Sequence, residues 1–234
     1  MLGQGLSVLD VGCGTGAITA GIADAVGPEG CVIGVDRDEV LLELARKEHA
    51  NRRNLRFEHG EATTLLFDAQ FDIVTASRTL QWIAEPALAI EKMKRAAKRG
   101  GMLVVLDYNH LGNKWEPDPP HAFNQIYKAF LAWREANQWD NEAAAHLPEL
   151  FRSAGLVNVA SLVQDEVVKR GDPDFAERSF LWVGTMEHVG GQLIAGKFCT
   201  AAELEEGRDI YRSWAETDLL KQTLAMKAVI GVVP

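Results

Sequence analysis

Three glycines stand in five residues of the stretch "VLDVGCGTG", Val8 to Gly16. Gly12, Gly14 and Gly16 follow an apolar run that Asp10 interrupts. Glycine lets a backbone turn tightly and approach a ligand without side-chain interference. A helix that follows such a loop offers unpaired N–H groups to an anionic ligand. The stretch therefore predicts a loop that binds part of a nucleotide or nucleoside.

Two acidic residues occur where such a ligand needs them. Asp36 ends the apolar run "VIGVD", about 20 residues beyond the loop, where an acid accepts hydrogen bonds from ribose hydroxyls. Glu61 follows a further strand-like run in "HGEAT" and is placed to meet an adenine amino group. Each feature alone is also explained by a tight turn or a solvated acid. Their order along the chain favours nucleotide binding.

The glycine pattern alone does not identify the nucleotide. Gly12, Gly14 and Ala17 satisfy the G-x-G-x-x-G/A pattern, so a nicotinamide-dependent oxidoreductase is an alternative. Asp10 counts against it, because a carboxylate is unfavourable beside a pyrophosphate but can bind an amino-acid ammonium. No constellation for hydride transfer is recognisable. A third alternative is a non-catalytic nucleoside-binding protein of the same fold.

The elements that must position these residues alternate along the first half. Strands are expected over 6–12, 30–36, 55–59, 71–77 and 102–108, and helices over 15–28, 37–52 and 86–101. The first helix is expected to bury Ile18, Ile22 and Val26, and the second Leu41, Leu44 and Ala45. Strands that alternate with helices in this way predict βαβ units and a doubly wound, Rossmann-like parallel sheet.

The second half is less regular. A Pro-rich segment leads into a helix with Phe123, Tyr127 and Phe130 on one side, and "AAAHLPELFRSAGL" predicts another helix. One strand is expected over 157–169, a mostly helical insertion over 172–222 and a final strand over 224–233.

Taken together, "VLDVGCGTG", "VIGVD", "HGEA", "FDIVTASRTLQWI" and "KRGGMLVVLD" resemble the class I S-adenosylmethionine-dependent methyltransferases. The similarity is greatest to the group that includes the ubiquinone/menaquinone and malonyl-carrier O-methyltransferases. It implies a seven-stranded, mostly parallel sheet whose last strand runs antiparallel. It also implies a cofactor-binding half at 1–108, core segments at 140–171 and 223–234, and helical insertions at 109–139 and 172–222 that form a lid.

The resemblance assigns roles to particular residues. S-adenosylmethionine is the implied cofactor and S-adenosylhomocysteine the product. Asp36 holds the ribose, Glu61 and Ala62 edge the adenine, and Ser77 to Trp82 face both cofactor and acceptor. The residues expected to bind the cofactor are Asp10, Gly12, Cys13, Gly14, Gly16, Asp36, Arg37, Glu61, Ala62 and Ser77; no metal is expected. Members of the family usually carry helices ahead of the glycine loop, so either the sequence is truncated or the insertions supply the cover.

Methyl transfer from a sulfonium depends mainly on alignment and exclusion of water, and a base is needed only for a protonated acceptor. Arg78 is the strongest candidate on the acceptor side, because guanidinium binds carboxylate in a bidentate way. Pairing with a neighbouring aspartate explains it equally well. "LQWI" resembles relatives that methylate carboxyl groups. Tyr108 is a candidate for orienting the acceptor, although packing explains it as well. His110 is a candidate for a base, although a surface histidine or one satisfied by its own loop is the more ordinary explanation.

Composition limits the partners. A net charge of −9 with only one dense basic stretch argues against nucleic acid. No run is long and apolar enough for a membrane span, and no signal peptide is recognisable. The three cysteines lack metal-ligand spacing, which favours a reduced, cytoplasmic setting. The aromatic residues of the insertions are expected to form core or a homodimer interface, with a few lining an apolar or carboxylate-binding acceptor pocket.

Overall fold

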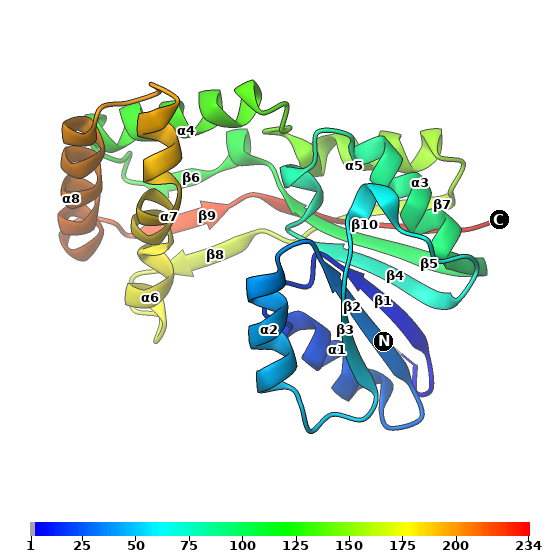
Figure 1. Ribbon diagram of the computed structural model, residues 1–234. Helices are drawn as coiled ribbons and strands as arrows, with labels where there is room; N and C mark the ends of the chain where they lie inside the picture. Colours follow the sequence, from blue (N-terminus) through cyan, green and yellow to red (C-terminus); the bar gives the residue numbers. More distant parts are fainter. Residues whose placement is uncertain (1–2) are drawn as a thin grey trace. The chain divides into compact units, whose positions relative to one another are not determined.

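The computed structural model describes residues 3–234, which form two compact units (Figure 1). The first unit comprises the described residues up to Asp107 together with Ala143–Val163 and Lys227–Pro234. The second comprises Tyr108–Glu142 and Gln164–Met226.

A seven-stranded sheet in the order β3-β2-β1-β4-β5-β10-β7 forms the centre of the first unit. Its strands are β1 (Ser7–Val11), β2 (Cys31–Asp36), β3 (Leu55–His59), β4 (Phe71–Ser77), β5 (Ala97–Tyr108), β7 (Val157–Val163) and β10 (Met226–Val232). The pairings from β3 through β5 are parallel, and β10 is antiparallel to β7. The doubly wound sheet predicted from the sequence is confirmed, including an antiparallel last strand.

Four helices flank this sheet. Helices α1 (Ala17–Val26) and α2 (Glu39–Glu48) cover one face, and α3 (Pro86–Ala96) and α5 (Ala143–Ser153) the other (Figure 1). Short 3₁₀ turns η1 (Ala62–Thr64) and η2 (Leu80–Trp82) follow β3 and β4. Helix α3 ends before the glycines that were expected to close it, because the chain enters β5 at Ala97.

The buried faces of two helices differ from the expected ones. Helix α1 buries Ala20, Ala23 and Val26, whereas Ile18 is 47% exposed. Helix α2 buries Leu42 and Ala45, whereas Leu44 is 50% exposed. Both helices carry apolar residues on more than one side, so several faces satisfied the helical spacing.

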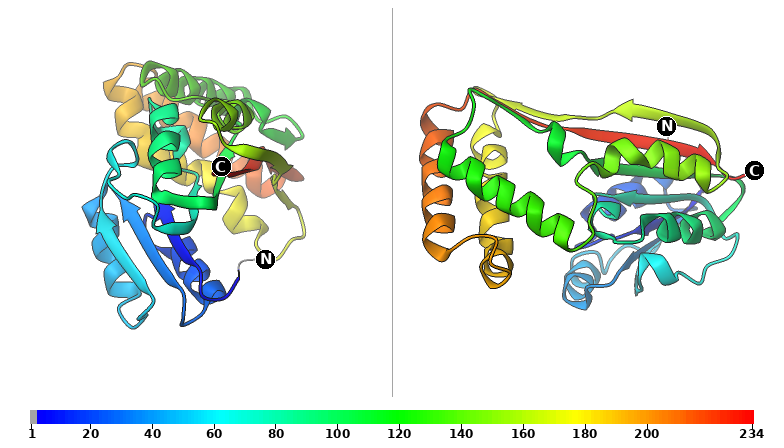
Figure 2. Two further views of the ribbon diagram at one scale, coloured as in Figure 1. Left: turned by 90° about the vertical axis from the view of Figure 1, so that its right-hand side faces the viewer. Right: turned by 90° about the horizontal axis from the view of Figure 1, so that it is seen from above.

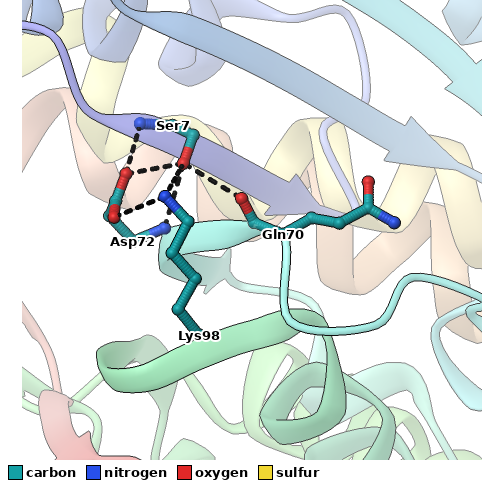
Figure 3. Close-up of polar contacts among 4 residues, drawn as sticks. All are labelled: Ser7, Gln70, Asp72 and Lys98. Carbon is teal, nitrogen blue, oxygen red and sulfur yellow. Dashed lines mark hydrogen bonds and ion pairs between the residues drawn. The ribbon is translucent and has the colours of Figure 1, made fainter.

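A polar network ties the amino ends of β1, β4 and β5 together (Figure 3). The Ser7 backbone N–H and hydroxyl both donate to Asp72 Oδ2, at 2.9 and 2.6 Å. Lys98 Nζ donates to Asp72 Oδ1 at 2.7 Å. This network lies at the edge opposite the carboxyl ends of the strands, where ligands bind in such sheets.

The second unit contains a small sheet that the sequence did not predict. Strands β6 (Lys114–Glu116), β9 (Lys221–Leu224) and β8 (Glu166–Lys169) are antiparallel in the order β6-β9-β8. The prediction of a single strand over 157–169 is therefore wrong, because this segment forms two strands, β7 and β8, which belong to different sheets. The helical insertion expected over 172–222 ends before β9.

The helices of this unit are α4 (His121–Ala136), α6 (Phe175–Ser179), α7 (Leu181–Ala195) and α8 (Ala201–Thr217), with a 3₁₀ turn η3 (His110–Gly112). Helix α4 packs against α8 (Figure 2). The approach is close at Gly207, where a Cβ atom would lie 2.6 Å from Ile126. Aromatic rings fill the space between the two helices; those of Phe123 and Tyr211 are 4.2 Å apart. Within residues 3–234 no helix is long and apolar enough to span a bilayer.

Candidate active site

A cavity of about 200 Å³ opens at the carboxyl ends of β1, β2 and β4, where ligands bind in a doubly wound sheet. All of its lining residues belong to the first unit: Val11, Gly12, Asp36, Arg37, Gly60, Glu61, Ala62, Arg78, Thr79, Trp82 and Ile83. Of the residues predicted from the sequence, the structure brings together Gly12, Asp36, Arg37, Glu61, Ala62, Arg78, Thr79 and Trp82 on this cavity.

The three glycines of the loop have left-handed backbones, with φ of +75° at Gly12, +53° at Gly14 and +81° at Gly16. A Cβ on Gly12 would lie 2.2 Å from the Thr79 hydroxyl, and one on Gly16 would lie 2.5 Å from the Phe57 ring. A Cβ on Gly14 would meet nothing within 4 Å. The first and third glycines thus permit close packing, and the second leaves space above the loop.

Asp36 lies on the cavity with both carboxylate oxygens fixed by main-chain amides. The Gly14 N–H donates to Oδ2 at 2.8 Å, and the Asp38 N–H donates to Oδ1 at 2.9 Å. Asp38 in turn caps helix α2 with its own side chain, which accepts from Val40 and Leu41. Since each carboxylate oxygen has a second lone pair, Asp36 can still accept two further hydrogen bonds in a set direction.

Asp10 lies beneath the loop and does not line the cavity. It is 2% exposed, and its Oδ2 accepts a hydrogen bond of 2.7 Å from Thr19. Burial raises its pKa to about 6 and the charge of Asp36 adds to the rise, while the Thr19 bond opposes it. Any influence of Asp10 on an ammonium is therefore exerted through the loop.

Cys13 is also buried within the loop. Its sulfur fills the space beside Gly34, where a Cβ would lie 2.9 Å from Sγ. Burial and the nearby charges of Asp10 and Asp36 raise its pKa to about 12, so the thiol stays protonated and is a poor nucleophile.

The third side of the cavity comes from the segment after β3. Gly60 donates its N–H to the Asp36 carbonyl at 3.0 Å, which holds this segment beside β2. Glu61 is exposed and precedes η1 without capping it, while Ala62 is buried at 9% exposure. The carboxylate of Glu61 and the small side chain of Ala62 thus form one edge of the cavity.

The segment after β4 supplies the opposite side. Arg78, Trp82 and Ile83 line the cavity there. Ser77 does not line it; its hydroxyl is buried and has no hydrogen-bond partner among the described residues. Of the segment from Ser77 to Trp82, which was expected to face a ligand, Arg78, Thr79 and Trp82 line the cavity.

Three lining residues were missed by sequence reasoning: Val11, Gly60 and Ile83. Thr79 lies within the predicted segment Ser77 to Trp82, but its packing against Gly12 was not predicted, because a glycine implies only that some neighbour needs the space. Nothing in the sequence says which residue that neighbour is.

Tyr108 and His110 lie in the second unit and do not line this cavity. Their rings stack at 5.5 Å, and the Phe130 ring lies edge-on to His110 at 5.5 Å. Burial and the charge of Arg134 lower the pKa of His110 to about 3, so the imidazole is neutral and weakly basic.

Most aromatic residues of the insertions pack on each other. Trp115, Phe123, Tyr127 and Phe130 surround Trp182, with ring centroids 4.9 to 6.2 Å from it. The space left among Phe123, Tyr127, Phe130 and Trp182 is about 10 Å³, roughly one water molecule. These rings form the core of the second unit.

The lining residues fit S-adenosylmethionine. Asp36 presents oriented acceptors for paired hydroxyls, and the Glu61 carboxylate on the lining offers an acceptor for an amino group. The neighbouring Gly14 leaves open space beside the main chain. No group of three His, Cys, Asp or Glu side chains within residues 3–234 is arranged to hold a metal ion.

Comparison with known proteins gives the family. A family model described as "Methyltransferase domain" matches residues 2–155. Demethylmenaquinone methyltransferase of Staphylococcus aureus is 33% identical over 175 residues, which cover 67% of this chain and 70% of that protein.

Solved structures agree in fold. Haemonchus contortus phosphoethanolamine N-methyltransferase 2 in complex with S-adenosyl-L-methionine aligns with 100% of this chain, at a TM-score of 0.62 and 18% identity. The chain covers 50% of that protein. The alignment with the YcgJ protein of Bacillus subtilis covers 97% of this chain and 91% of the YcgJ chain, at a TM-score of 0.59 and 19% identity.

These matches decide against the nicotinamide-dependent oxidoreductase that the glycine pattern had left open. The chain belongs to the class I S-adenosylmethionine-dependent methyltransferase family, and it is an enzyme that transfers a methyl group from this cofactor to a small organic molecule.

Proposed function

We propose that the cavity of the first unit holds both the cofactor and the reacting end of the acceptor. Asp36 binds the ribose hydroxyls, and Glu61 and Ala62 bind the adenine edge. Gly12 and Gly14 lie against the methionine portion, and Arg37 lines the ribose side. The observation that carries this assignment is the Asp36 carboxylate, fixed on the cavity by the Gly14 and Asp38 amides.

We assign the acceptor to the side formed by Arg78, Trp82 and Ile83. A guanidinium beside an aromatic ring and an aliphatic side chain suits a small molecule with an apolar body and an anionic oxygen. The acceptor proposed here is therefore a carboxylate or an acidic hydroxyl compound. Demethylmenaquinone, named as the acceptor of the Staphylococcus aureus relative, belongs in the first acceptor screen.

The chain's part in the reaction is then mainly positioning. S-adenosylmethionine supplies, when bound, an electrophilic methyl group on a positively charged sulfur. Arg78 holds the acceptor in its anionic form by pairing with the oxygen, so no side chain needs to remove a proton at that atom. Trp82 and Ile83 exclude water from the apolar part of the acceptor. Alignment of this kind contributes about 7–11 kcal/mol in well-oriented systems.

We propose no base role for His110, because its low pKa and its packing between Tyr108 and Phe130 suit a structural group. For the compartment we propose the cytoplasm, supported by the three unpaired cysteines Cys13, Cys31 and Cys199. A nucleic-acid acceptor is disfavoured by the net charge of −9.

Binding of S-adenosylhomocysteine, measured by titration calorimetry, tests the cofactor assignment. Asp36→Ala removes the acceptor of two ribose hydrogen bonds and is expected to weaken binding by at least about 100-fold, since bonds to a charged group contribute about 1.5–3 kcal/mol each. Asp68→Asn is the matched control. It removes one acidic charge from an exposed pair with Arg95, away from the cavity lining, and should leave affinity unchanged. Equal affinity of the Asp36→Ala and Asp68→Asn proteins would contradict the assignment.

A further inference from the structure

Arg78 has an unusual backbone for a residue with a large side chain. Its φ is +58°, in the left-handed region that favours glycine. A non-glycine residue remains there only when its surroundings hold it, and such positions gather at functional sites. Arg78 also lines the cavity, so the contacts that hold its backbone decide where its guanidinium can lie.

Both peptide groups of Arg78 are tied to the core of the first unit. Its N–H donates to the Leu106 carbonyl at 2.7 Å, and its carbonyl accepts from Gln81 Nε2 at 3.3 Å. Gln81 is only 2% exposed, and its own N–H donates to Asp107 Oδ2 at 3.0 Å. Asp107 is fully buried. A buried carboxylate at the end of β5 therefore fixes Gln81, and Gln81 fixes Arg78.

Thr79 joins the same segment to the glycine loop. Its hydroxyl lies 3.0 Å from the Ser77 carbonyl and 3.3 Å from the Val11 carbonyl, with one proton shared between them. Gly12 leaves the space in which this threonine sits. The segment that carries Arg78 is thus held from the β5 side and from the cofactor side.

We propose that Gln81, Asp107 and Thr79 are positioning residues that keep Arg78 in its left-handed conformation and thereby keep its guanidinium on the acceptor side of the cavity. This inference rests on the proposed function, in which Arg78 binds an anionic acceptor. None of the three positioning residues needs to contact the acceptor, because they act through the Arg78 backbone.

The melting temperatures of Arg78→Gly and Arg78→Ala, compared without any substrate, test whether the surroundings keep position 78 in the left-handed conformation. In a held left-handed position, Arg78→Gly is expected to melt about 2–4 °C above Arg78→Ala. Gln81→Met keeps the shape and the N–H bond to Asp107 but removes the donor to Arg78. In that background the difference should vanish or reverse, because alanine then relaxes into a right-handed conformation.

Ala69 is a matched control, since it has a φ of +49° in the same unit. The melting difference between Ala69 and Ala69→Gly should be the same with and without Gln81→Met. If Gln81→Met prevents folding, Thr79→Val supplies the second background. The proposal is overturned if Arg78→Gly and Arg78→Ala differ in melting temperature by the same amount with and without Gln81→Met (or Thr79→Val).

A binding measurement tests whether the fixed Arg78 backbone matters for binding an anionic ligand in the cavity. Benzoate, an aromatic carboxylate, is titrated against protein saturated with S-adenosylhomocysteine. Arg78→Gln and Gln81→Met should each weaken benzoate by about tenfold, the loss of one charge-assisted contact, with unchanged affinity for S-adenosylhomocysteine. Equal benzoate affinity in wild type and Gln81→Met, or no benzoate binding to wild type, contradicts the inference. Absence of S-adenosylhomocysteine binding contradicts the proposed function instead.

Discussion

At the scale of single residues, two glycines of one loop perform different tasks. Gly12 and Gly14 both have positive φ, yet a Cβ at position 12 would overlap Thr79 and a Cβ at position 14 would enter open space. Gly12 is therefore required by the packing of the site, whereas no protein contact explains Gly14, which we assign to the ligand. The sequence pattern alone treats the two positions alike.

Alanine substitution separates these tasks. Gly14→Ala should lower the free energy of unfolding by only about 1–2 kcal/mol, the cost of a left-handed alanine, and still abolish cofactor binding. Gly12→Ala should destabilise the protein more, and Thr79→Ala should partly restore it by removing the two closest atoms. Urea denaturation and S-adenosylhomocysteine titration measure both effects; equal destabilisation by the two alanines would count against the packing argument.

Asp10 gives a prediction with a defined pH dependence. Its pKa is about 6 in the folded protein, above its ordinary value of 3.8. Between these values the folded state binds more protons than the unfolded state, so the contribution of Asp10 to stability falls as the pH rises through this window. The charged form at neutral pH is therefore the destabilised one.

Asp10→Asn keeps an oxygen for the Thr19 bond and removes the charge. Its stability relative to wild type should improve by about 2 kcal/mol between about pH 4 and pH 7. Urea denaturation of both proteins without cofactor across this range provides the measurement. A difference that is constant with pH means that Asp10 does not titrate in this window.

At the scale of elements, the amino ends of β1, β4 and β5 depend on one carboxylate. Partial burial raises the pKa of Asp72, but hydrogen bonds from Lys98 and Ser7 outweigh this and lower the value to about 2. The stabilisation is thus fully present above the ordinary pKa of 3.8 and is lost as the pH falls toward 2.

Asp72→Asn should destabilise the protein by about 1 kcal/mol at neutral pH, a value that allows for solvent screening of a partly exposed pair. The difference from wild type should shrink as the pH falls from about 4 to 2. Asp68→Asn, in an exposed pair with Arg95, serves as the control and should have little effect at any pH. Equal effects of the two variants would contradict a stabilising role for the network of Ser7, Asp72 and Lys98.

Hydrophobic periodicity predicted where the helices and strands of the first unit lie, but it was less successful in predicting which of their residues are buried. Leu42 rather than Leu44 faces the core from α2, because the helix carries leucines on two sides and only tertiary packing selects between them. The run over 157–169 is interrupted by the polar residues Gln164, Asp165 and Glu166, a local signal for the break between β7 and β8 that the prediction of a single strand did not use. Pairing of β8 with β9 is a contact between distant segments, which single-sequence patterns do not report.

At the scale of the whole molecule, the described chain places the candidate cofactor site in the first unit alone. The glycine loop and the acids after β2 and β3 were found from the sequence because their positions follow from the order of strands. The packing of Thr79 against Gly12 and the hydrogen bonds of Gln81 with Arg78 and Asp107 were not, because they are contacts between separate loops. The lid role of residues 109–139 and 172–222 stays a prediction.

The most direct measurement is a crystal structure of the protein with S-adenosylhomocysteine. The account predicts both ribose hydroxyls within hydrogen-bonding distance of the Asp36 carboxylate, which keeps its bonds from Gly14 and Asp38, and the amino-acid portion above Gly14. Ribose bound elsewhere, or an Asp36 side chain turned away from it, would contradict the central claim.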